Sequence, residues 1–397
     1  MKTMFPFYSE HIKHWNIDQS ILFLNHGSFG ATPIKVLEQQ QQFQLQLERQ
    51  PLRFFMRELP DLHQKTLQHL GAFLQCNPQD LVYVRNATEG VNTVLSSIPW
   101  QKNDRVLITN HIYQACKNAL FIYAQRYGFE IDEVEVSYPY QNEDEIVQCV
   151  LKGITKNTRL LLIDHISSPT ALHFPIEKIA SNLKGSRVEL LVDGAHAPGM
   201  IPIQPSETGA QYYTGNCHKW LCAPKGAAFL WVEPKCQEYI NPLNISMINV
   251  KTQSFQDRFY WGGTQDLSSF LSIPKAIESI PEIFGKSWEE VMERNYMMSR
   301  KVSQLLSSKL QQLVPIPEGS IINMCSLPLP KLGRALQPGE FDPLQEKLYY
   351  EYKIEIPVIN WGRENQRFIR YSCFVYNSLE QYEYLGEVLE RELLKNK

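Results

Sequence analysis

Residues 188–199 read Val-Glu-Leu-Leu-Val-Asp-Gly-Ala-His-Ala-Pro-Gly, and residues 214–220 read Thr-Gly-Asn-Cys-His-Lys-Trp. The first stretch is an apolar run that stops at Asp193, which predicts a buried parallel strand with this acid at its carboxyl end. In the second stretch Lys219 lies between apolar segments, and desolvation there would lower its pKa and leave a nucleophilic amine. Pyridoxal phosphate requires such a pair: a lysine for a Schiff base and a carboxylate that keeps the pyridine nitrogen protonated.

Both residues also have ordinary explanations. Acids at strand ends are most often turn or capping residues, and most lysines extend their amine to water. These two residues alone therefore only suggest a cofactor site, and support has to come from the remaining sequence.

The composition narrows the class of protein. The chain has 397 residues, 43% of them hydrophobic, enough for one large domain and a smaller one. A net charge of −3 without a basic stripe argues against nucleic acid as a partner. No signal-peptide core and no apolar run of about 18 residues is present, so we expect a cytoplasmic protein without a membrane partner. The eight cysteines lack C-x-x-C spacing, and we expect free thiols and no metal site.

Short apolar strands alternate with helical patterns in the first half of the chain. The expected strands cover residues 81–84, 105–109, 131–136, 159–164 and 188–193, and the expected helices residues 62–74, 114–127, 144–152 and 176–183. This alternation predicts an α/β fold with a mostly parallel central sheet and helices on both of its faces.

The sequence changes in texture after Pro281. A long helical pattern over residues 288–313 suits a bridge between two domains. Short strands at 321–326, 353–358 and 367–372 and a helix at 378–394 follow it. We expect three parts: an N-terminal arm at 1–24 that packs with the small domain, a large cofactor-binding domain at 25–285, and a small α+β domain at 286–397.

Polar residues follow several of the expected strands. Residues 85–90 read Arg-Asn-Ala-Thr-Glu-Gly before an apolar helix, where free amides and the helix dipole favour a phosphate, although many helices are capped this way and bind nothing. Ligands of parallel sheets lie at the carboxyl ends of the strands. The candidates that fall there are Thr88, Tyr113, Ser168, Thr170, Asp193, His196 and Lys219.

A further turn, residues 25–30, reads Asn-His-Gly-Ser-Phe-Gly. It is either a plain turn into the helix that Thr32-Pro33 would begin or a loop that faces the substrate with Asn25 and His26.

Taken together, these motifs resemble the class V aminotransferase family of fold-type I pyridoxal phosphate enzymes. The resemblance covers essentially the whole chain and includes Asp-Gly-Ala-His-Ala-Pro-Gly, His-Lys-Trp, Gly-Gly-Thr-Gln-Asp (262–266) and Ile-Arg-Tyr-Ser (369–372). Within the family the chain is similar to the isopenicillin N epimerase-like branch, which also includes C-S lyases such as hercynylcysteine sulfoxide lyases.

The resemblance implies a role for each matching residue. Lys219 would be the Schiff-base lysine and Asp193 the partner of the pyridine nitrogen. Arg370 would hold the α-carboxylate of the substrate, which suits its planar fork. The other implied cofactor contacts are His196 at the ring hydroxyl, Tyr113 on the ring face, Ser168 near the ring oxygen, and Ala87, Thr88, Asn216 and His218 at the phosphate.

The resemblance also implies an obligate homodimer in which Thr264 reaches the phosphate site of the neighbouring subunit. Two positions depart from the pattern of many relatives, which have histidine in place of Tyr113 and asparagine in place of Ser168.

The implied chemistry begins with removal of the Cα proton of an amino-acid-like substrate by Lys219. Epimerisation, transamination or β-elimination can follow, and the motifs do not choose between them. We expect an epimerase-like enzyme, with a C-S β-lyase or an aminotransferase as alternatives. The cysteine desulfurases of this family need a reactive cysteine on a loop shortly before the carboxylate-binding arginine. Residues 358–366, which precede Arg370, contain no cysteine, so the resemblance disfavours a cysteine desulfurase. A catalytically inactive binding protein is the alternative from another class, and the retention of Lys219 and Asp193 argues against it.

Overall fold

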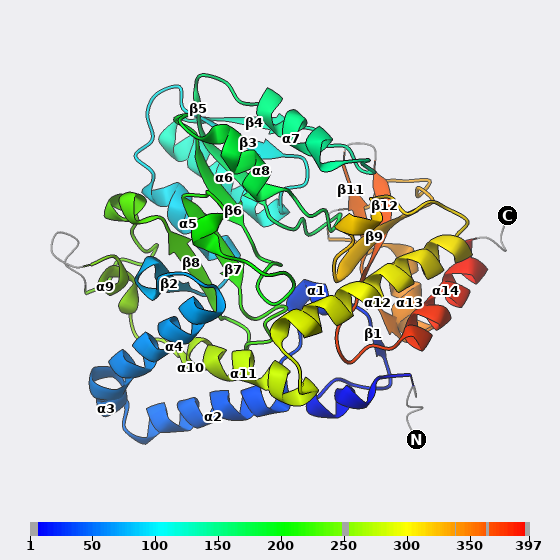
Figure 1. The fold of residues 1–397 in the computed structure, drawn as a ribbon, viewed down its shortest axis with the longest axis horizontal. Coiled ribbons are helices and arrows are strands. Elements are labelled where there is room, and N and C mark those ends of the chain that lie inside the picture. The colour runs from blue at the N-terminus through cyan, green and yellow to red at the C-terminus, as the bar shows by residue number, and fades with distance from the viewer. Residues whose placement is uncertain (1–6, 248–253, 338, 363–364, 394–397) are drawn as a thin grey trace.

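The computed structural model describes residues 7–247, 254–337, 339–362 and 365–393. Its centre is a seven-stranded sheet with the order β2-β8-β7-β6-β5-β3-β4 (Figure 1). The strands are β2 (Leu81–Val84), β3 (Arg105–Thr109), β4 (Glu130–Val134), β5 (Thr158–Asp164), β6 (Glu189–Asp193), β7 (Tyr212–Asn216) and β8 (Ala228–Val232). The mostly parallel sheet predicted from the sequence is confirmed.

The directions of the strands decide where a site can form. β3 to β7 pair in parallel, whereas β8 is antiparallel to both of its neighbours, β7 and β2. β2 therefore runs in the same direction as the parallel strands. The carboxyl ends of all strands of this sheet except β8 consequently lie at one edge.

The alternation of side chains along each strand creates two cores, one on each face of the sheet. In β5, Leu160 and Leu162 belong to one core and Leu161 and Ile163 to the other. The first core also contains apolar residues of α5 (Ala87–Ser97) and α6 (Gln114–Tyr127). The second contains those of α4 (Leu59–Phe73), α7 (Glu143–Lys152), α8 (Ile176–Leu183) and α11 (Ile273–Phe284).

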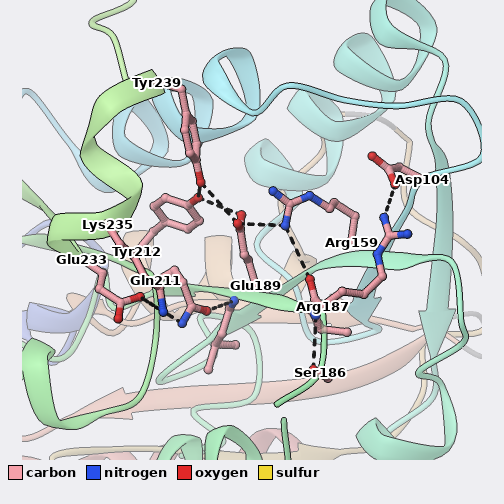
Figure 2. Close-up of polar contacts among 12 residues, drawn as sticks. Asp104, Arg159, Ser186, Arg187, Glu189, Gln211, Tyr212, Glu233, Lys235 and Tyr239 are labelled. Carbon is pink, nitrogen blue, oxygen red and sulfur yellow. Dashed lines mark hydrogen bonds and ion pairs between the residues drawn. The ribbon is translucent and has the colours of Figure 1, made fainter. Parts of the chain in front are cut away.

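A polar network closes the amino-terminal edge of the sheet (Figure 2). The carboxylate of Glu189, at the start of β6, accepts a hydrogen bond from Tyr212 at 2.8 Å and pairs with Arg159 at 2.8 Å. Close by, Arg187 pairs with the buried Asp104. These polar groups therefore satisfy one another, and they join β5, β6 and β7 at the edge opposite the carboxyl ends.

The C-terminal part contains a smaller antiparallel sheet of order β11-β12-β9, drawn in orange beside the yellow α12 and the red α14 in Figure 1. Its elements are α12 (Trp288–Lys309), β9 (Met324–Leu329), α13 (Pro343–Tyr350), β10 (Ile354–Glu355), β11 (Val358–Trp361), β12 (Gln366–Ser372) and α14 (Leu379–Leu393). Figure 1 shows α12 running from the helices below the large sheet to the small one.

Three details of this part differ from the expectation. The strand expected at 353–358 is interrupted at Pro357, which cannot donate a ladder hydrogen bond, and β10 pairs in parallel with β1 (Leu22–Phe23) instead. β9 begins three residues later than the expected strand, and α12 ends at Lys309. β1 and a hydrogen bond from Ser9 N to Tyr376 O tie the N-terminal residues to the C-terminal part. The expected domain boundaries themselves stay a prediction.

The remaining α-helices lie along the N-terminal segment and below the large sheet. They are α1 (His26–Phe29), α2 (Ile34–Arg49), α3 (Pro51–Arg53), α9 (Phe255–Tyr260) and α10 (Ser268–Leu271). Within the ranges that the structure describes, none of the helices has the length and apolar character needed to cross a membrane.

Candidate active site

A cavity of about 850 Å³ lies where the carboxyl ends of the large sheet meet the small sheet. Its walls are formed by α1, the end of β4, the segments that follow β3, β5 and β7, and the strands β11 and β12. Residues at its surface include Ser28, Tyr113, Ser168, Lys219, Trp361 and Arg370.

Lys219 lies in the turn after β7, partly buried, and its Nζ is 3.1 Å from Nε2 of His196. Burial, followed by the nearby Arg370 guanidinium, lowers the pKa of this lysine to about 8, and the carboxylate of Asp193 opposes that shift. A much larger fraction of this amine is therefore uncharged near neutral pH than of an exposed lysine. The group is suited to act as a nucleophile or a base.

Asp193 is buried at the end of β6, as the sequence predicts. Its Oδ1 accepts the amide hydrogen of Ala195 at 3.0 Å, and its Oδ2 accepts the thiol hydrogen of Cys116 at 3.3 Å. Asp164 is its register partner on β5, and Oδ2 of Asp164 is buried without a hydrogen bond in the described residues. Burial raises the pKa of both acids, and Asp193 raises that of Asp164 further, to well above its usual value. Asp164 therefore holds its proton to the higher pH, and Asp193 is the member of the pair that ionises first.

The start of α5 lies where the sequence predicts an anion cradle. Asn86 caps the helix and accepts the amide hydrogen of Glu89 at 2.9 Å. The amide of Ala87 donates to Oδ1 of Asn216 at 2.8 Å, so this donor is already engaged. The Thr88 hydroxyl and the Asn216 Nδ2 form no hydrogen bond among the described residues, and they remain available to a phosphate.

His218 lies beside the cradle, and its Nδ1 donates to the Ala227 carbonyl at 3.0 Å. This bond leaves Nε2 as the free ring atom. Burial lowers the pKa of His218 to about 4, with Lys219 as a lesser cause. The ring is therefore neutral, and the carbonyl of Ala227, the residue before β8, fixes its position.

Arg370 projects from β12 into the cavity although only 3% of it is exposed. It donates to the carbonyl and hydroxyl of Ser168 and, at 2.8 Å, to the hydroxyl of Ser28. Its buried Nε has no hydrogen bond, and no carboxylate pairs with the guanidinium in the described residues. Burial lowers its pKa to about 10.

Tyr113 and Ser168 both face the cavity, but they differ in what they contact. Tyr113 is the N-cap residue of α6 and is 44% exposed. Partial burial raises the pKa of its hydroxyl. Ser168 is held by Arg370. Thr170, in contrast, is buried against His111 at 2.7 Å and does not line the cavity.

The turn at 25–30 reaches the site with residues other than those expected. Asn25 accepts a hydrogen bond from Ser28 at 2.6 Å. The His26 ring is fully buried between Tyr376 OH at 2.7 Å and the Lys219 carbonyl at 3.2 Å, and it does not line the cavity. Ser28 and Phe29, one helical step further, do line it. The turn therefore contacts Lys219 from behind through His26 and faces the cavity through Ser28.

Thr264 lies in an exposed loop between α9 and α10 and does not line the cavity of its own chain. Its implied contact with a neighbouring subunit stays a prediction.

Sequence reasoning missed several residues of the site. Asp164 carries the same signal as Asp193, an acid that ends an apolar strand, and could have been found. Ser28 and Phe29 follow from the turn at 25–30 once its direction is known. Cys116 and Trp361 carry no local signal, because tertiary contacts alone bring them to the site.

Comparison with known proteins gives consistent similarities. A family model described as aminotransferase class V matches residues 23–329. The chain is 26% identical over 394 residues to a probable chloroplastic L-cysteine desulfhydrase of Arabidopsis thaliana, with 94% of this chain and 83% of that protein covered. It is 25% identical over 391 residues to isopenicillin N epimerase of Streptomyces clavuligerus, with 94% and 95% covered.

Among solved structures, a cystine C-S lyase in complex with its product cysteine persulfide superimposes with a TM-score of 0.78. The two chains are 19% identical, and the match covers 93% of this chain and 97% of the other. At this level of identity the likeness concerns the fold.

Proposed function

The chain belongs to the class V aminotransferase family, whose members are pyridoxal phosphate enzymes, and from that premise we propose that it cleaves the Cβ–S bond of an α-amino acid by β-elimination. The family, the fold and the cofactor expected from the sequence are confirmed. The choice of reaction, the roles of the site residues and the dimer belong to the proposal.

The residues present fit the cofactor. Lys219 supplies the amine that would link it, and Asp193 would face its pyridine nitrogen. The free donors of Thr88 and Asn216 at the start of α5 would hold its phosphate. His196, Tyr113 and Ser168 surround the space between these groups. When bound, pyridoxal phosphate supplies an electron sink for the charge that proton removal leaves on the substrate Cα.

The observation that carries the α-amino acid substrate in this proposal is the unpaired Arg370. A buried guanidinium without an anion is costly, and native proteins usually pair it. Arg367 shows this on the same strand, since its Nε donates to the buried Asp342 at 2.7 Å. Arg370 instead faces the cavity, where the α-carboxylate of an amino acid would complete its contacts. A carboxylate held there lies close to Lys219, whose pKa Arg370 lowers.

A β-elimination needs little more than Lys219. Its Nζ takes the Cα proton, and the resulting ammonium can return that proton to the leaving sulfur as the Cβ–S bond breaks. The products are a thiol and an enamine, and water converts the enamine to pyruvate and ammonia.

Epimerisation, in contrast, needs a second acid on the opposite face of Cα. Among the described residues of the cavity wall, Lys117 is engaged by Glu133. The Tyr113 hydroxyl also faces the cavity, but its raised pKa makes it a weaker acid than an ordinary phenol. Epimerisation with Tyr113 as that acid is therefore the second candidate.

The test uses the cofactor-loaded protein in D₂O with cysteine, cystine and larger S-conjugates of cysteine. We expect pyruvate and ammonia in equal amounts, together with a visible absorbance band that Lys219→Ala abolishes. Deuterium at Cα with inverted configuration and no pyruvate would establish the second candidate instead. A protein that remains colourless with added cofactor would contradict both.

The same premise includes a homodimer. Thr264 is exposed, and so are several large apolar side chains, including Phe29 at 72%, Leu52 at 75% and Met247 at 86%. A second copy of the chain that covered these side chains would remove apolar surface from water, which is favourable. We infer that a second copy of the chain covers them and places its Thr264 beside the cradle at α5.

A further inference from the structure

A short chain of ring contacts links Trp220 to the amine of Lys219. The indole Nε1 of Trp220 donates to Nδ1 of His196 at 3.5 Å. On the other side of the imidazole, Nε2 is 3.1 Å from Lys219 Nζ. Trp220 and His196 are both almost fully buried. Water therefore does not compete for these contacts.

The indole nitrogen fixes the tautomer of the histidine. An indole N–H can only donate, so the His196 Nδ1 that faces it accepts and carries no proton. Burial, followed by the charges of Lys219 and Arg370, lowers the pKa of His196 well below its usual value, so the ring is neutral. A neutral imidazole with a bare Nδ1 carries its proton on Nε2.

The tautomer in turn decides the direction of the next hydrogen bond. Nε2–H must donate, so Lys219 Nζ accepts through its lone pair. Only the uncharged amine has that lone pair, because an ammonium group has three donors and no acceptor. The contact therefore favours the neutral form of Lys219.

We propose that Trp220 is a positioning residue that acts through His196: its indole N–H holds the ring proton on Nε2 and thereby favours the uncharged form of the Lys219 amine. The proposal rests on the proposed function in one respect, the role of Lys219 as the residue that links the cofactor. It adds a second cause, the direction of a hydrogen bond, for the larger uncharged fraction of the Lys219 amine.

The surrounding contacts hold Trp220 in place. Its ring lies 4.9 Å from that of His26 and 6.1 Å from that of Phe374. Nε2 of His26 also lies 3.2 Å from the carbonyl oxygen of Lys219. The indole therefore has little freedom to turn its N–H away from His196.

Other charged and titratable groups also act on the Lys219 amine. They are Arg370, Asp193, Asp164, Cys116, His196 and His218. A change of Trp220 to phenylalanine alters none of these groups and removes the N–H. A shift in the titration of Lys219 would then report the hydrogen-bond chain.

The first measurement needs no variant. In full-length protein freed of cofactor and labelled with ¹⁵N-histidine, NMR is expected to show His196 with a protonated Nε2 and a bare Nδ1. A proton on Nδ1 in the wild-type protein would overturn the proposal.

The second measurement follows the titration of Lys219 through its ¹³C-labelled Cε, with the signal assigned by its loss in Lys219→Arg. In Trp220→Phe the ring proton can move to Nδ1, Nε2 can accept from the ammonium, and the midpoint is expected to rise. The expected rise is about one pH unit, the size that one hydrogen bond supports. An unchanged midpoint would count against the proposal.

Trp231→Phe is the matched control. Trp231 is also buried, at 3% exposed, and its indole nitrogen has no hydrogen-bond partner in the described residues. This variant should keep the wild-type tautomer and midpoint, and an equal rise in both variants would assign the effect to packing and refute the proposal. In a His196→Gln background, Trp220→Phe should produce no further rise. These measurements use no substrate. A failure to release pyruvate would therefore contradict the proposed function without contradicting this inference.

Discussion

Two arginines on one strand illustrate how the same side chain takes opposite roles. Arg367 and Arg370 are three residues apart on β12, so they project from opposite faces of the strand. Arg367 is paired with Asp342, whereas Arg370 has no carboxylate partner in the described residues. We expect Arg370→Ala to reduce kcat/KM for carboxylate substrates about 100-fold or more, because charge-assisted hydrogen bonds to the substrate are lost.

Alanine substitution of Arg370 and of Arg367 should affect the stability of the protein to different extents. Arg370→Ala removes a buried unpaired charge, so thermal unfolding should show no loss of stability. Arg367→Ala leaves Asp342 buried without its partner and should cost about 3–5 kcal/mol. Steady-state kinetics together with thermal unfolding separates the two roles. Equal destabilisation by both variants would show that Arg370 is part of the framework.

At this scale the sequence was informative where a residue ends a strand. Asp193 and the cradle at Thr88 follow from local patterns, and Asp164 would have followed from the same rule. The direction of a side chain on a short turn was not predictable, because rotation by one residue moves a group to another face. Asn25 and His26 were expected to face the substrate, but the structure directs Ser28 and Phe29 there.

Among the elements, the turn that ends α1 packs closely against the segment that carries Lys219. Gly30 has φ +69°, and a Cβ at this position would lie 2.5 Å from the His218 carbonyl oxygen and 2.6 Å from that of Lys219. Gly30→Ala should therefore displace the segment that carries Lys219. We expect a loss of stability of about 2–4 kcal/mol from strain and overpacking, together with weaker retention of the cofactor, measured by absorbance after dialysis.

Gly128→Ala is the control for the backbone term. Gly128 ends α6 with φ +79°, and a Cβ there would meet nothing within 4 Å. Its cost should remain near 1 kcal/mol, and the cofactor should be retained. Similar losses in the two variants would mean that the contact with the Lys219 segment has no importance.

Two helices were predicted with both of their ends correct. The helices expected at 114–127 and 176–183 have these bounds in the structure. In each, buried residues recur at helical spacing, so local pattern and tertiary packing agree. The strand expected at 353–358 failed because Pro357 divides it, and its halves pair with different partners.

For the whole molecule, the alternation of strands and helices predicted the α/β class but not the order of the strands. The order β2-β8-β7-β6-β5-β3-β4 places strands that are distant in sequence side by side, and β8 runs against its neighbours. Such pairings depend on tertiary contacts, since a single strand's pattern does not identify its neighbour. The arrival of Arg370 and Trp361 at the site depends on the same contacts.

The proposed dimer can be tested by mixing two defective chains. Lys219→Ala removes the amine, and Thr264→Asp would place a negative charge beside the neighbouring phosphate. In a mixed dimer one site would contain both defects, and the other would combine a normal Lys219 with the normal Thr264 of its partner. Random exchange of subunits should therefore restore about a quarter of the wild-type sites.

The measurement is product release after the two variants are unfolded together and refolded. Separate refolding of each variant is the control and should leave activity low. Sedimentation should show twice the mass of one chain at every protein concentration used, since an obligate dimer has no stable single subunit. If Thr264 acts only within its own chain, co-refolding will restore no activity above the sum of the separate samples, because each chain would keep its own defect in its own site.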